Sequence, residues 1–141
     1  GGRDPELMAV VRNPIDWLGS WYRYRTRDDL AGQPNSTNAI SFDDFVLEYC
    51  KGEPAPFANV GSQDRFLRIN DGELAVQHLF QYEQWDQVIG YLEERLQMQI
   101  TLKQKNVSPK MDLTLSAEVE AKLRDKRAAE FATWNSAFRQ I

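Results

Sequence analysis

The stretch LMAVVRNPIDWLGSWYRYRTR, residues 7–27, decides the fold that the sequence predicts. Its first five residues, 7–11, form an apolar run that is typical of a buried strand. Asn13 and Pro14 then predict a helix that begins at Pro14, because asparagine is a common N-cap and proline is favoured at the first helical position. Asp16, in the first turn, suits the positive end of the helix dipole.

A strand that leads through a short turn into a helix is also a favourable place to bind an anion. This geometry directs backbone N–H groups and Arg12 toward the carboxyl edge of a sheet, where open α/β sheets bind phosphorylated ligands. Ser20 lies about two helical turns further on, so its hydroxyl is expected to contact the same anion. We therefore predict Arg12 and Ser20 as ligands of a phosphate group.

Later segments predict a second strand and helix. A turn at residues 70–72 precedes an apolar-rich strand at 74–82, which is bent near residues 77–78, and a helix follows from Glu83. The apolar positions of that helix form a stripe at helical spacing: Trp85, Val88, Ile89, Leu92 and Leu96. Glu83 is interpreted as a charge at the helix N-terminus or an arginine partner, with a general base as the alternative.

Further helices are expected at about 42–50, after the capping residue Ser41, at 63–69, and from Ser116 to the end, where an apolar face continues to Phe138. Residues 98–102 are expected to form a short edge strand. Two βα units in sequence favour a parallel sheet. The predicted class is α/β and helix-rich, with a short parallel sheet covered by helices, and residues 1–141 form a single domain.

Composition limits the function classes. Apolar residues make up 42% of the chain and aromatic residues 11%, which indicates a globular domain rather than a disordered segment. The net charge of −4 argues against nucleic acid or an anionic membrane as the main partner. Cys50 and His78 are the chain's one cysteine and one histidine, so no metal site is expected and a reducing cytoplasm fits best. No apolar run is long enough to predict a membrane span.

The opening motif resembles a known signature. Arg12-Asn13-Pro14, followed after five residues by Ser20-Trp21-Tyr22, is similar to the 3′-phosphate-binding motif of sulfotransferases that use PAPS (3′-phosphoadenosine 5′-phosphosulfate). Four later stretches, residues 63–67, 71–74, 80–83 and 106–108, resemble the larger, bacterial-type branch of that family. The similarity covers nearly the whole chain, and the spacing between the arginine and the serine is its most specific part.

The resemblance implies a fold, a donor and a site. It implies part of a P-loop-type, three-layer sulfotransferase fold, with Arg12 and Ser20 holding the 3′-phosphate of PAPS and no metal involved. Family members also carry a glycine-rich, basic loop that cradles the 5′-phosphosulfate, and no such loop precedes Arg12 here. The chain therefore resembles the C-terminal portion of such an enzyme, and this segment alone is expected to be inactive because that loop and the usual catalytic base lie elsewhere.

Several alternatives stay open at the level of sequence. The segment also fits a P-loop nucleotide kinase or NTPase, or a non-catalytic interaction domain of the same fold. Trp21 and Tyr22 are interpreted as core residues, with stacking on the donor's adenine as the alternative. The resemblance specifies neither the catalytic residue nor the oligomeric state, and it leaves the acceptor class open, whether a hydroxyl or an amine.

Overall fold

The chain folds into two compact units, which we describe separately. The structure is a computed structural model that describes residues 8–68, 72, 74–76, 78–97 and 112–137. The first unit consists of Gly1–Asn13, Ser62–Lys103 and Ala129–Ile141, and the second of Pro14–Gly61 and Gln104–Ala128. The prediction that residues 1–141 form one domain stays a prediction.

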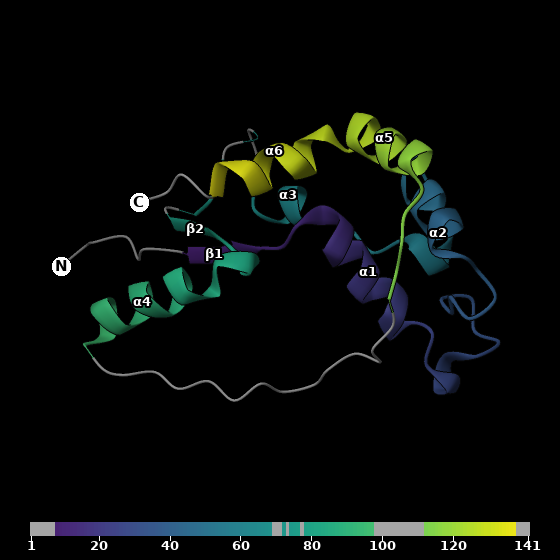
Figure 1. Ribbon diagram of the computed structural model, residues 1–141, viewed down its shortest axis with the longest axis horizontal. Helices are drawn as coiled ribbons and strands as arrows, with labels where there is room; N and C mark the ends of the chain where they lie inside the picture. The colour runs from purple at the N-terminus through teal and green to yellow at the C-terminus, as the bar shows by residue number, and fades with distance from the viewer. Residues whose placement is uncertain (1–7, 69–71, 73, 77, 98–111, 138–141) are drawn as a thin grey trace. The chain divides into compact units, whose positions relative to one another are not determined.

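A two-stranded parallel sheet organises the first unit. Strand β1 is Met8–Val11 and strand β2 is His78–Gln81, with Met8 opposite His78 and Val11 opposite Gln81. Figure 1 shows the two strands side by side. The core beside them is apolar and combines all three segments of the unit: Val11, Leu67, Leu79 and Ala137, with Ala9, Leu74, Val76 and Trp134 packed against it.

Three helices and a short turn complete the first unit. Helix α3 is Gln63–Phe66, α4 is Trp85–Leu96 and α6 is Ala128–Ala137, and a single turn of 3-10 helix, η3 (Tyr82–Gln84), joins β2 to α4. Ser62 starts α3, since its hydroxyl accepts a hydrogen bond from the Arg65 N–H. Helix α4 contacts β2 through Tyr91, whose ring lies 5.1 Å from that of Phe80.

The second unit is helical. It contains α1 (Pro14–Tyr24), α2 (Phe42–Tyr49) and α5 (Ala117–Lys126), with single 3-10 turns η1 (Asp28–Leu30) and η2 (Pro56–Ala58) in its loops. Helix α2 packs against both α1 and α5, and Figure 1 shows α5 beside α2. The buried aromatic rings Tyr22, Phe42 and Phe45 contact one another at centroid distances of 5.4 to 6.3 Å.

Most predicted elements are confirmed. The structure is helix-rich with a short two-stranded parallel sheet, as the α/β class requires. The helix beginning at Pro14 and the caps at Ser41 and Ser116 are where the sequence places them. The second strand begins at His78 rather than Leu74, because β1 offers only four residues to pair with and Leu74 instead bridges Arg68. The predicted edge strand at 98–102 lies outside the described residues.

The helices of the C-terminal half differ from the sequence pattern in burial and in number. The predicted apolar stripe of α4 is largely not buried among the described residues: Val88 is buried, whereas Trp85 is 40% and Leu96 58% exposed. A sheet of two four-residue strands is too small to cover a twelve-residue helix. The C-terminal helical region is two helices, because α5 ends at Lys126 and Arg127 leaves helical geometry with φ −124° and ψ 40°.

Candidate functional site

The carboxyl ends of the two strands meet at Arg12 and Tyr82. Val11 and Gln81, the last residues of β1 and β2, are paired in the sheet. Arg12 directly follows Val11, and Tyr82 directly follows Gln81. The Arg12 guanidinium carbon lies over the Tyr82 ring at 4.8 Å from its centroid, a cation–π contact. Within the first unit, among the residues that the structure describes, no carboxylate forms an ion pair with Arg12.

The backbone of Arg12 is held by a side chain from α3. The Arg12 N–H donates to Gln63 Oε1 at 3.0 Å, and Gln63 Nε2 donates to the Arg12 carbonyl at 2.9 Å. Gln63 lies 51 residues away in the sequence. Its carboxamide thus pairs with the N–H and the carbonyl of one residue, as a neighbouring strand would. Residues 63–67 were part of the sulfotransferase resemblance, but nothing in the sequence indicates this pairing.

Glu83 holds the next backbone N–H along the chain. The Asn13 N–H donates to Glu83 Oε2 at 2.8 Å, and the indole Nε1 of Trp134 donates to Glu83 Oε1 at 2.8 Å. Both carboxylate oxygens therefore accept a hydrogen bond from a fixed donor. This arrangement explains Glu83 as a residue that joins the end of β1 to α6, and it gives the general-base interpretation no support.

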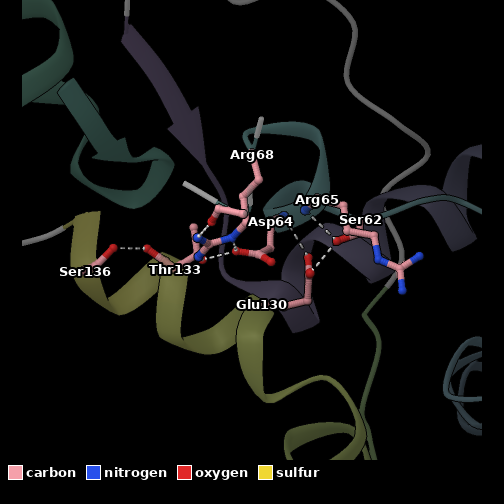
Figure 2. Close-up of polar contacts among 8 residues, drawn as sticks. Ser62, Asp64, Arg65, Arg68, Glu130, Thr133 and Ser136 are labelled. Carbon is pink, nitrogen blue, oxygen red and sulfur yellow. Dashed lines mark hydrogen bonds and ion pairs between the residues drawn. The ribbon is translucent and has the colours of Figure 1, made fainter. Parts of the chain in front are cut away.

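A polar cluster joins α3 to α6 (Figure 2). The Ser62 hydroxyl donates to the Glu130 carboxylate, which also accepts the Asp64 N–H at 3.3 Å. Asp64 Oδ1 accepts from Arg68 Nε at 2.9 Å and from the Thr133 hydroxyl. Asp64, Glu130 and Thr133 are buried, with exposed fractions of 6%, 7% and 4%. Two buried carboxylates are stable here because each one accepts two hydrogen bonds.

The other predicted ligand, Ser20, belongs to the second unit. It is half-buried on α1, whereas Arg12 belongs to the first unit. Tyr22, two residues further along α1, is a core residue: its hydroxyl donates to the Ile40 carbonyl at 2.6 Å, and burial raises the pKa of the phenol. Trp21 is half-buried, and the Arg25 guanidinium lies over its ring at 5.2 Å.

Two further findings concern cofactors and membranes. Over the described parts of the chain, no group of three or more His, Cys, Asp or Glu side chains is arranged to hold a metal ion. In the same parts, no helix is both long enough and apolar enough to cross a membrane.

Comparison with known proteins adds no family to this description. No protein-family model, no curated protein and no solved structure matches the chain.

Proposed function

We propose that this chain is the donor-binding and acceptor-side part of a PAPS-dependent sulfotransferase with a P-loop-type, three-layer fold. The observation that carries the proposal is the position of Arg12. It lies at the carboxyl end of a parallel strand, its backbone is fixed by Gln63, and its guanidinium contacts an aromatic ring instead of a carboxylate among the described residues of its unit. The signature that includes Arg12 and Ser20 supports the same assignment.

In this proposal Arg12 binds the donor and takes no part in bond making. Its planar, permanently charged guanidinium suits bidentate binding of the 3′-phosphate, and Ser20 adds a hydroxyl to the same group. PAPS supplies the sulfuryl group, which passes to an acceptor hydroxyl or amine as adenosine 3′,5′-bisphosphate leaves. Positioning and charge stabilisation account for most of the catalysis in such a displacement, so a donor-fixing arginine contributes to both affinity and alignment.

Nucleotide titration separates this proposal from a nucleotide kinase or NTPase. We expect the protein to bind adenosine 3′,5′-bisphosphate about 10- to 100-fold more tightly than adenosine 5′-monophosphate, since a charged hydrogen bond contributes about 1.5–3 kcal/mol. Isothermal calorimetry measures the dissociation constants of the two nucleotides and, in a third titration, that of ATP with Mg²⁺. Equal binding of the two adenosine nucleotides contradicts the proposal, and a clear preference for ATP with Mg²⁺ favours the kinase or NTPase.

A further inference from the structure

We propose that Gln63 is a positioning residue that sets the direction of the Arg12 side chain for 3′-phosphate binding. The inference rests on the proposed function, because it assigns a role in that binding site. Gln63 itself contacts only the backbone of Arg12 in the hydrogen bonds that join the two residues. It is therefore expected to act on the ligand through Arg12.

The two hydrogen bonds hold both the N–H and the carbonyl of Arg12. A carboxamide carries one acceptor and one donor side by side, as the edge of a strand does. The Arg12 N–H requires the Gln63 oxygen to face it, and the Arg12 carbonyl requires the Gln63 nitrogen, so the two bonds also fix the orientation of the amide. Arg12 immediately follows β1. These bonds therefore give the backbone hydrogen-bond partners at one residue beyond Val11, where the strand ends.

The backbone on either side of Gln63 is also held by hydrogen bonds. Both sequence neighbours of Gln63 are bonded to Glu130 of α6: Ser62 through its hydroxyl and Asp64 through its N–H. Asp64 is bonded in addition to Thr133, one turn further along α6. Figure 2 shows these side chains of α3 and α6 directed toward one another. The α3–α6 cluster thereby holds the short helix that carries Gln63, although the helix has only four residues.

The geometry leaves few substitutes for glutamine. Methionine has a similar length but neither donates to the Arg12 carbonyl nor accepts strongly from its N–H. Asparagine keeps the amide but is one methylene shorter, so it does not reach both groups from the same backbone position. Both variants should lose the paired contact, while the cluster of Ser62, Asp64 and Glu130 stays in place.

The test combines a binding ratio with hydrogen exchange. In Gln63→Met and Gln63→Asn we expect the preference for adenosine 3′,5′-bisphosphate over adenosine 5′-monophosphate to fall about tenfold, while affinity for the monophosphate changes little. The ratio is insensitive to stability, because partial unfolding weakens both nucleotides equally. The matched control is Gln87→Met, which makes the same replacement at an exposed position of α4 and should keep the wild-type ratio.

Hydrogen exchange tests the contact without any ligand. The Arg12 amide should exchange about tenfold faster in Gln63→Met than in wild type, whereas the Leu79 amide in β2 should be unchanged. Unaltered Arg12 exchange, or an unaltered nucleotide ratio in a wild type that does show the preference, overturns the inference. If the wild type shows no preference, the proposed function has failed instead, and exchange at Arg12 alone reports whether Gln63 holds that backbone.

Discussion

The peptide groups that follow β1 are held by side chains rather than by another strand. Gln63 pairs with Arg12, and Glu83 accepts from the Asn13 N–H. Backbone groups at this point have left the sheet ladder and not yet entered the repeat of α1, so they need other partners. Their pairing fixes the chain at the residue on which the proposed anion site depends.

Glu48 provides a test at the scale of one ionisable residue. Its carboxylate forms an ion pair with Lys51 at 2.9 Å and accepts the Ala55 N–H at 3.0 Å, and these contacts lower its pKa below the usual 4.5. A lowered folded-state pKa means that the charged form stabilises the fold at pH values above 4.5 and that this contribution disappears as the pH falls through the folded-state pKa.

The variant Glu48→Gln should therefore be less stable than wild type at neutral pH and approach it in acid. Urea unfolding at a series of pH values from about 7 to about 3 measures the difference in unfolding free energy, which we expect to shrink steadily below 4.5. Glu53→Gln is the control, since Glu53 is an exposed carboxylate in the loop that follows α2. A Glu48→Gln difference that stays constant with pH would show that the charge of Glu48, held by Lys51 and the Ala55 N–H, makes no contribution.

Sequence reasoning succeeded at residues whose role is local. The apolar run before Arg12, Pro14 at the first helical position and the Ser41 and Ser116 hydroxyls each act within a few residues, so the pattern alone predicts them. Gln63 could not be found this way, because its partner is 51 residues distant and a half-buried glutamine has no distinctive neighbours in sequence. Glu83 was recognised as a structural charge, but its partners proved to be an amide and an indole.

At the scale of elements, α3 and α6 are joined by buried polar groups. Two carboxylates, two hydroxyls and an arginine join these helices, in addition to the apolar core to which Leu67 and Ala137 belong. A polar contact of this kind is directional, because each hydrogen bond requires one orientation of the helices. Within the first unit, the position of α3 should therefore depend on Thr133 and Glu130.

The change Thr133→Val tests this junction. Valine keeps the shape of threonine but removes the hydroxyl that donates to Asp64 and lies 3.5 Å from Arg68 Nη2, so we expect a loss of about 1.5–3 kcal/mol in unfolding free energy. Thr133→Ser is the matched control, because it keeps the hydroxyl and should lose only about 1 kcal/mol for the buried methyl group. Urea unfolding of both variants decides the matter. Equal losses would mean that packing, and not hydrogen bonding, holds α6 to α3.

The break between α5 and α6 shows why element boundaries were harder to predict than element types. Neither proline nor glycine lies near Arg127, so the local sequence contains no helix-breaking signal. Arg127 instead makes tertiary contacts, since its Nη2 donates to the Tyr49 carbonyl at 2.8 Å and its guanidinium lies 4.1 Å from the centre of the Tyr49 ring. The residue at which α5 ends is therefore marked by contacts with Tyr49 of α2, which is far away in the sequence.

At the scale of the whole molecule, the two predicted phosphate ligands belong to different compact units. Arg12 belongs to the first and Ser20 to the second, although only seven residues separate them in the chain. The sequence predicted the strand that Arg12 follows and the helix that contains Ser20, because strand and helix signals are local. It could not predict how the chain divides, since residues 1–13 join segments that begin at residue 62 and at residue 129.

A cycle that combines two proteins with two nucleotides tests the central claim most directly. Wild type and Arg12→Ala are each titrated with adenosine 3′,5′-bisphosphate and with adenosine 5′-monophosphate, which gives four dissociation constants. Ser20→Ala enters as a third protein and should lose less of the preference than Arg12→Ala, because a neutral hydroxyl contributes about 0.5–1.5 kcal/mol. Arg65→Ala is the control: Arg65 is an exposed arginine of α3 whose removal changes the net charge by the same amount.

The cycle isolates the interaction of Arg12 with the 3′-phosphate. We predict that removing this phosphate weakens binding to wild type and to Arg65→Ala by about 10- to 100-fold but hardly affects Arg12→Ala, which corresponds to a coupling of about 1.5–3 kcal/mol. A coupling of zero, with Arg12→Ala preferring the bisphosphate by the same factor as wild type, would show that Arg12 does not hold the 3′-phosphate and would contradict the account.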